Sequence, residues 1–206
     1  MRLEPFLLTG SVVVLEPLTP THVARLGAAA ANRDSFGFTM VPSDLDSMQR
    51  YVATLLADAD ADAAIPFVQR RLADGTVVGC TRFMSLAWWT GRSTPAEVEI
   101  GGTWLSTDAQ RTAVNTEAKL LLLGQAFDQW RVNRVAICTD ARNTQSRQAI
   151  ERLGATFEGV LRNHRPAAGH FSTPGAARDT ATYSILPGEW PAIRDRLHDR
   201  LAAPTA

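Results

Sequence analysis

The order of strand-like and helix-like segments is the feature that most restricts the fold of this 206-residue chain. Two apolar runs at residues 65–72 and 76–86 flank Asp74-Gly75, a dipeptide that favours a tight β-hairpin. A third strand, at residues 97–106, is followed by a long apolar helix and then by another strand, which predicts a crossover connection. Hairpins join antiparallel strands and crossovers join parallel ones, so the sequence predicts a mixed sheet.

The whole pattern predicts an α/β (α+β) fold whose mostly antiparallel sheet is flanked by helices. Seven strands are expected, at residues 11–16, 65–72, 76–86, 97–106, 134–140, 157–164 and 179–186. Helices are expected at residues 19–31, 43–56, 112–130, 143–153 and 190–201. We expect a single domain, residues 1–206, with a core at about 11–186 and a C-terminal helical extension at 187–206.

The charge of the chain excludes one class of partner. Its 21 basic and 21 acidic residues give a formal net charge of zero, whereas nucleic-acid binders usually carry a basic surplus. No apolar run reaches the roughly 20 residues that cross a bilayer. We therefore expect neither a nucleic-acid partner nor a membrane partner.

The cysteines and histidines bear on compartment and metal content. Cys80 and Cys138 lie inside apolar runs, which favours two free thiols in a reducing cytoplasm, with a disulfide as the alternative. The N-terminal segment carries Glu4 and Pro5 and lacks the pattern of a cleaved signal peptide. No group of ligands has metal-site spacing, so we expect a cytoplasmic protein without a metal.

The segment at residues 97–119, EVEIGGTWLSTDAQRTAVNTEAK, is the most informative for chemistry. It leads a strand through a tight turn into a long helix. The first amides of a helix have no intrahelical partner, and the helix dipole adds positive potential there. This arrangement suits a phosphate or pyrophosphate, although many such turns bind nothing.

Two blocks of this chain resemble the GNAT superfamily of N-acetyltransferases. Residues 110–115, Gln-Arg-Thr-Ala-Val-Asn, are similar to its acetyl-CoA pyrophosphate loop, Gln/Arg-x-x-Gly-x-Gly/Ala, with Ala113 and Asn115 departing from the preferred residues. Residues 143–147, 151–155 and 158–162 resemble the second conserved block of the branch related to ribosomal-protein N-terminal acetyltransferases. The resemblance covers about residues 11–195.

The resemblance implies a fold, a cosubstrate and a binding site. The sheet would splay between its fourth and fifth strands, and acetyl-CoA would enter the gap. The backbone at Trp104 and Leu105 would pair with the pantetheine arm, and Asn143 and Ser146 would touch it. The pyrophosphate would lie against the loop made by Gln110, Arg111, Thr112, Ala113, Val114 and Asn115.

Glu99 is the candidate general base, because several family members carry a catalytic Glu at this place in the central strand. Strand alternation predicts that Glu97, Glu99, Thr103 and Leu105 share one face, and that Val98, Ile100 and Trp104 share the other. An attacking amine must be neutral, so a base is needed, acting directly or through water. The alternative is a structural carboxylate pair that binds an arginine such as Arg82.

Ser146 is the candidate for stabilising the departing thiolate, because a hydroxyl near the start of a helix can donate to sulfur. Many family members place an acidic Tyr four residues later, where this chain has Ile150. The alternative for Ser146 is an ordinary residue of the first helical turn.

The resemblance predicts an acetyl-CoA-dependent N-acetyltransferase that acts on a primary amine, either a protein N-terminus or a small molecule. The alternative is a catalytically silent module that binds or senses acyl-CoA. Trp88-Trp89 leaves three roles open: core packing, which is the default, a wall of the acceptor cleft, or a homodimer interface.

Overall fold

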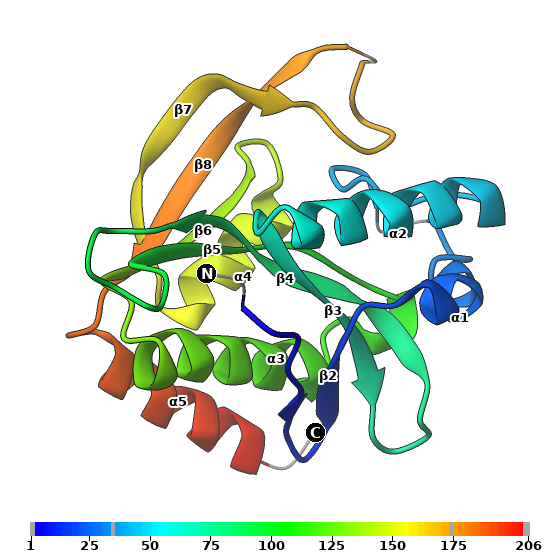
Figure 1. Cartoon of the computed structure of the whole chain (residues 1–206). Helices are drawn as coiled ribbons and strands as arrows, with labels where there is room; N and C mark the ends of the chain where they lie inside the picture. The colour runs from blue at the N-terminus through cyan, green and yellow to red at the C-terminus, as the bar shows by residue number, and fades with distance from the viewer. Residues whose placement is uncertain (1–2, 34–35, 174, 204–206) are drawn as a thin grey trace.

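A computed structural model describes residues 3–33, 36–173 and 175–203 of the chain. Its strands form one mixed sheet in the order β1-β2-β3-β4-β5-β6-β8-β7 (Figure 1). Neighbouring strands are antiparallel except for β5 and β6, which are parallel. The bounds are β1 Leu8–Thr9, β2 Val13–Pro17, β3 Ala64–Arg71, β4 Val77–Ala87, β5 Glu97–Leu105, β6 Arg134–Asp140, β7 Thr156–Pro166 and β8 Ala177–Ile185.

The predicted mixed, mostly antiparallel sheet is confirmed, with eight strands in the described residues instead of seven. The additional strand is β1, which has two residues and pairs with β2. A strand of this length is too short to produce an alternating pattern in the sequence.

Helices cover both faces of the sheet. They are α1 Val23–Ala29, which follows a 3₁₀ turn at Pro20–His22, α2 Leu45–Asp60, α3 Ala113–Gly124, α4 Thr144–Leu153 and α5 Trp190–Ala202. One hydrophobic cluster joins the sheet to α3, α4 and α5, and a second joins it to α1 and α2. Figure 1 shows α3 and α5 side by side, with α1 and α2 on another part of the sheet. The described helices lack the length and apolar character needed to cross a bilayer.

Side chains fix the helix starts that border the site. The Thr112 side chain accepts a hydrogen bond from the Val114 amide at the start of α3, and the Asn143 side chain accepts one from the Ser146 amide at the start of α4. At the other end of α4, Gly154 takes a left-handed conformation with φ 103°. These caps satisfy backbone groups that have no partner within the helix.

A bulge in β5 overturns part of the predicted side-chain alternation. Between the pairs Cys80–Trp104 and Arg82–Gly101, β5 advances by one residue more than β4, and Gly102 adopts φ 57°. Leu105 therefore packs in the same cluster as Val98 and Ile100, whereas Trp104 packs in the opposite one. The predicted faces hold as far as Ile100 and are inverted for Trp104 and Leu105, because an extra residue reverses the alternation of a strand.

The parallel pairing of β5 with β6 is short. It joins Glu97 to Arg134, Val98 to Val135 and Glu99 to Ala136, although β5 continues to Leu105 and β6 to Asp140. The two strands separate beyond Glu99, which confirms the expected splay of the sheet. With β1 counted, the separating strands are the fifth and the sixth.

Both cysteines are free thiols, as expected. Cys80 is buried on β4, and Cys138 is half-buried on β6.

The Glu117 carboxylate fastens α3 to the turn between β1 and β2. It accepts hydrogen bonds from the backbone amides of Ser11, Val12 and Val13 at 2.7–2.8 Å and from the Ser11 hydroxyl at 2.7 Å. Gly10 allows this approach, since a Cβ there would lie 2.2 Å from the carboxylate. Burial raises the pKa of Glu117, but these hydrogen bonds together outweigh burial and hold the pKa below its ordinary 4.5.

We predict that Glu117→Gln lowers the free energy of unfolding by about 2–4 kcal/mol, because an amide cannot accept from all four donors. The loss should be full above pH 4.5 and should shrink as the pH falls, since protonation removes the same acceptor from the wild type. Chemical denaturation at several pH values measures it. The exposed control Glu4→Gln should change stability by less than about 0.5 kcal/mol, and an equal effect of both substitutions would contradict the assignment.

Candidate active site

A cavity of about 580 Å³ opens where β5 and β6 separate. Its walls come from the far half of β5, the loop before α3, the start of α4, the β7–β8 hairpin and the segment around Phe38. Most residues that the sequence predicted for the site line it, namely Glu99, Trp104, Leu105, Gln110, Arg111, Thr112, Asn115, Asn143 and Ser146. Ala113 and Val114 are not lining residues, and the Val114 side chain packs in the core.

Local contacts shape the loop before α3. Arg111 has φ 60°, a left-handed conformation that turns the chain toward the helix. The Gln110 side chain donates to the Leu105 carbonyl at 3.0 Å, and the Thr112 hydroxyl donates to the Ala109 carbonyl at 2.7 Å. These bonds fold the turn back onto the end of β5 and direct the helix N-terminus at the cavity.

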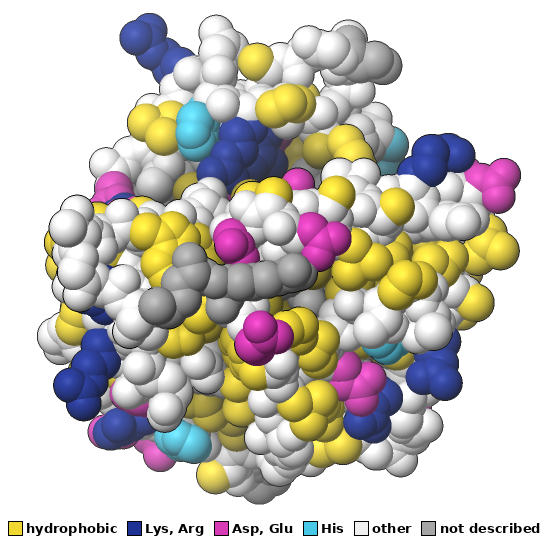
Figure 2. All heavy atoms as spheres, in the orientation of Figure 1, with side chains coloured by type: hydrophobic (Ala, Val, Ile, Leu, Met, Phe, Trp, Pro, Cys, Tyr) yellow, Lys and Arg dark blue, Asp and Glu magenta, His cyan; other side chains and the backbone are white. Residues whose placement is uncertain are grey.

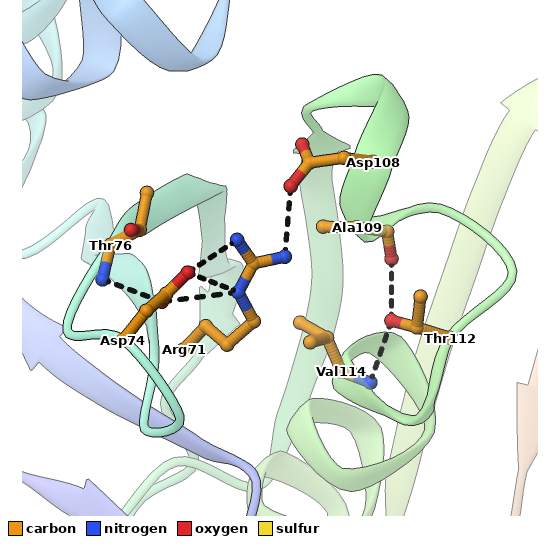
Figure 3. A network of polar contacts seen from close by, with 7 residues as sticks. All are labelled: Arg71, Asp74, Thr76, Asp108, Ala109, Thr112 and Val114. Atoms are coloured by element: carbon orange, nitrogen blue, oxygen red, sulfur yellow. Dashed lines mark hydrogen bonds and ion pairs between the residues drawn. The ribbon is translucent and has the colours of Figure 1, made fainter. Parts of the chain in front are cut away.

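An ion-pair network anchors the same loop to the β3–β4 hairpin (Figure 3). Arg71 donates to Asp108 at 2.8 Å and to Asp74 at 2.7 Å. Hydrogen bonding at its carboxylate, which includes the bond from Arg71, lowers the pKa of Asp108, and the partners Asp74 and Asp108 raise the pKa of Arg71. The short 3₁₀ turn at Thr107–Ala109 is thereby held in place ahead of α3.

The cavity is strongly basic, although the chain has no net charge. Among the described residues that line it, seven side chains are basic and one is acidic, namely Arg82, Arg111, Lys119, Arg152, Arg165, Arg178 and Arg200 against Glu99. Charge of one sign in a cleft concentrates ligands of the opposite sign. Asn115 adds a buried side-chain oxygen that has no hydrogen-bond partner in the described structure. The cavity therefore suits a polyanionic ligand that also carries hydrogen-bond donors.

Glu99 lies at the point where the strands separate and is 4% exposed. Arg165 of β7 donates two hydrogen bonds of 2.8 and 2.6 Å to its carboxylate, and the Ser85 hydroxyl donates a third to the same carboxylate at 3.3 Å. This ion pair raises the pKa of Arg165. The sequence indicated an arginine such as Arg82 as an alternative partner of this carboxylate, but the arginine that binds Glu99 is Arg165.

Glu97 belongs to a separate ion-pair group. Arg134 of β6 lies 3.3 Å from its carboxylate and also binds Glu158 of β7. The Glu97 side chain is 38% exposed and does not line the cavity. The two glutamates thus bind different arginines, and of the two only Glu99 faces the cavity.

Ser146 and Asn143 stand together at the start of α4. Asn143 uses its side-chain oxygen to cap the helix, accepting from the Ser146 amide at 3.0 Å. Ser146 lines the cavity, and its hydroxyl forms no hydrogen bond within the part of the chain that the structure describes. Ile150, where the family often has Tyr, also lines the cavity.

Sequence reasoning missed Lys119, the single lysine of the chain. Its side chain lines the cavity from α3 and is buried, and its Nζ donates to the Thr103 hydroxyl at 2.8 Å. Burial lowers its pKa from 10.5 to about 8. Its position within a long apolar run of α3 was the one available signal.

Two adjacent tryptophans lie at the surface. Trp88 and Trp89 are 37% and 56% exposed, so the predicted core packing is wrong for both. Trp88 lines a separate cavity of about 230 Å³ beside Leu3 and Leu86.

Across the described ranges, no three His, Cys, Asp or Glu side chains are grouped so that they could hold a metal ion.

Comparison with known proteins identifies several relatives. The family model described as acetyltransferase (GNAT) domain matches residues 13–156. The Bacillus subtilis (strain 168) protein named "Putative ribosomal N-acetyltransferase YdaF" is 33% identical over 89 residues. That match spans 43% of this chain and 45% of the relative, less than half of its length.

Solved structures extend the likeness to nearly the whole chain. A GCN5-related N-acetyltransferase from Brucella melitensis superposes with a TM-score of 0.83 at 28% identity, covering 98% of this chain and 88% of that one. Mycobacterium smegmatis RimJ, solved in complex with CoA-disulfide, superposes with a TM-score of 0.72 at 22% identity, covering 98% and 96%. Proteins of this fold thus include one whose structure contains bound CoA-disulfide.

We predict that the contribution of Lys119 to the stability of the ligand-free protein rises between pH 8 and pH 10.5, because the unfolded chain keeps a proton on Lys119 that the folded protein releases. Lys119→Met should abolish this rise and increase the free energy of unfolding at pH 7 by at most about 3 kcal/mol. Denaturation at pH 7 and pH 10 measures both effects. Thr103→Val, which removes the partner of the ammonium group, should destabilise more at pH 7 than at pH 10. A pH-independent difference between Lys119→Met and the wild type would contradict the assignment.

Proposed function

The chain belongs to the GNAT acetyltransferase family, and from that premise we propose that it transfers an acetyl group from acetyl-CoA to a primary amine. The observation that supports this most directly is the basic cavity at the separation of β5 and β6. In a chain without net charge, that concentration of arginines suits a cosubstrate with several phosphates.

The proposed cosubstrate site uses both backbone and side chains. The backbone of Gln110, Arg111, Thr112, Ala113, Val114 and Asn115 would bind the pyrophosphate at the N-terminus of α3. Arg111, Arg152 and Arg200, from the loop, α4 and α5, would neutralise the phosphates. The edge of β5 at Trp104 and Leu105, together with Asn143 and the unpartnered Asn115 oxygen, would hold the pantetheine arm.

Acetyl-CoA, when bound, supplies an acetyl group activated as a thioester. The acceptor amine must lose its proton before it can attack, and Glu99 is proposed as the base, acting directly or through one water. Its carboxylate faces the cavity and is fixed by Arg165 in a single orientation. The two arginine bonds leave further lone pairs on the oxygens, since a carboxylate has about four acceptor sites.

Ser146 is proposed to stabilise the leaving thiolate. Ser146 lines the cavity without another hydrogen-bond partner for its hydroxyl in the described structure, and it sits in the first turn of α4, where the helix N-terminus favours negative charge. Because Ile150 cannot donate a proton, the hydroxyl and the helix amides would carry this role without the Tyr that many relatives use.

The acceptor is proposed to be a protein N-terminus or a small-molecule amine. The name of the Bacillus relative favours a ribosomal protein, whereas the small-molecule reading draws on the family at large. We propose a single-domain cytoplasmic enzyme, with a homodimer as its candidate assembly. The second candidate function is a silent acyl-CoA-binding module, which Ala113 in the cofactor loop and Ile150 on α4 favour.

Ligand-dependent melting and product release test the proposal. Acetyl-CoA at 100 times its dissociation constant should add about 2.7 kcal/mol to the free energy of unfolding. A panel of amines and N-terminal peptides should then yield free CoA thiol. Stabilisation without turnover of any amine would favour the silent module, and the absence of both would overturn the proposed function.

We predict that Glu99→Gln lowers kcat by at least about 10²-fold, because the amide keeps the shape but cannot accept a proton. Acetyl-CoA affinity should stay within about twofold. The matched control Glu97→Gln should retain turnover, since Glu97 lies outside the cavity. A Glu99→Gln enzyme as active as the wild type would remove Glu99 as the base. Equal losses of stability and turnover in Glu99→Gln and Arg165→Met would indicate a structural ion pair instead.

We predict that Ser146→Ala lowers kcat by about 10-fold or more while the dissociation constant for acetyl-CoA hardly changes. Steady-state kinetics and calorimetric titration separate the two quantities. A parallel loss of affinity and turnover would mean that the hydroxyl binds the cosubstrate and does not act on the leaving group.

A further inference from the structure

Arg178 lies on β8 directly opposite Arg165 of β7, and both residues line the cavity with Glu99. The two arginines differ in what they bind. Arg165 holds Glu99 at 2.6–2.8 Å, whereas Arg178 has no ion pair and its Nε is buried without a hydrogen-bond partner in the described structure. Burial lowers the pKa of Arg178 despite attraction from Asp140.

The carboxylates around Arg178 already have partners. Asp140 is gripped by Arg142 at 2.8 and 3.0 Å, Asp179 accepts from the Asn163 amide at 2.9 Å, and Glu99 is held by Arg165. Arg178 is half-buried, and a charge partly removed from water without a direct partner opposes folding. No ion pair within the described part of the chain neutralises this charge.

A second unpaired arginine lies on the same face of the sheet. Arg82 of β4 lines the cavity and forms no ion pair within the described ranges. Its guanidinium lies over the bulge of β5, where a Cβ on Gly102 would approach it to 2.7 Å. The bulge glycine therefore permits this arginine to cross β5 toward the cavity.

These arginines lie apart from the ones assigned to the cosubstrate. Arg111, Arg152 and Arg200 come from the loop before α3, from α4 and from α5, which pack together on one face of the sheet. Arg178 and Arg82 share the other face with Glu99 and Trp104, as strand alternation and the bulge require. Figure 2 shows basic side chains gathered in the recess between the β7–β8 hairpin and α2.

We propose that Arg178, assisted by Arg82, is an anion-binding subsite for the acceptor, so that the amine this protein acetylates carries a carboxylate or phosphate near its amino group. This inference rests on the proposed acetyl-transfer function. A planar guanidinium binds carboxylate and phosphate through paired hydrogen bonds, which places the acceptor amine beside Glu99. The anion belongs either to a small amine or to an acidic side chain near a peptide N-terminus, and the experiment separates the two.

The test compares related acceptors with and without the anionic group. The pairs are phenylalanine with phenylalaninamide, phosphoethanolamine with ethanolamine, and N-terminal peptides beginning Ser-Glu with peptides beginning Ser-Gln. Wild-type kcat/KM should favour the anionic member of at least one pair by about 10-fold or more. Arg178→Ala should raise KM for that member by about 10- to 100-fold and change the neutral member by less than about twofold, and Arg178→Lys should restore part of the loss.

Arg162 supplies the matched control, because it lies exposed on the same hairpin and does not line the cavity. Arg162→Ala should leave the preference intact. Arg178→Ala should fold at least as stably as the wild type, since the guanidinium it removes has no partner to lose.

Three results would overturn the subsite. They are wild-type kcat/KM values without charge preference, equal losses for anionic and neutral acceptors in Arg178→Ala, and a preference that Arg162→Ala abolishes equally. In each case, turnover of any amine leaves the acetyl-transfer proposal standing. If no amine is turned over, calorimetric titration of N-acetylphenylalanine and N-acetylphosphoethanolamine tests the anion-binding subsite instead. Weaker binding to Arg178→Ala than to the wild type supports the subsite, and equal or absent binding overturns it.

Discussion

The separation of β5 from β6 after three parallel residue pairs is the constraint on which the cavity depends. A paired strand exposes no backbone hydrogen-bonding groups along its paired edge, and it brings its neighbour to within about 5 Å. Ending the pairing at Glu99 frees the edge of β5 and opens space between the strands. The Gly102 bulge lies just past that point, where it bends β5 and redirects the side chains that follow.

Hydrogen bonds and ion pairs around the cavity fix the positions of the elements that form it. Glu117 fastens α3 to the β1–β2 turn, and Arg71 anchors the turn before α3 through Asp108. Arg165 joins the outer hairpin to β5 through Glu99. Each anchor is a charged group with several hydrogen bonds, which is stronger and more directional than apolar contact. A site fixed in this way needs little rearrangement to receive a ligand.

The buried and half-buried charges form two groups, one with partners and one without. Glu117 and Glu99 are fully paired, whereas Lys119 rests on one hydroxyl and Arg178 on no partner in the described chain. Burying an unpaired cation opposes folding, so such groups persist where a ligand supplies the missing anion or acceptor. Both cations border the cavity, which is the pattern expected of a site adapted to an anionic ligand and not to folding alone.

The sequence by itself determined the mixed sheet, the Asp74-Gly75 hairpin and the strand–turn–helix segment. These depend on local periodicity, turn chemistry and helix capping, which act over a few neighbouring residues. The resemblance to the GNAT superfamily indicated nine of the residues that line the cavity. Only the tertiary structure decided that Glu99 binds Arg165, 66 residues away, that Lys119 is buried, and that Trp104 and Leu105 exchange faces. The insertion of β8 between β6 and β7 sets the first of these, and a single extra residue in β5 sets the last. Neither leaves a local pattern, because partners across a sheet are chosen by strand order and register, which form only when the whole chain packs.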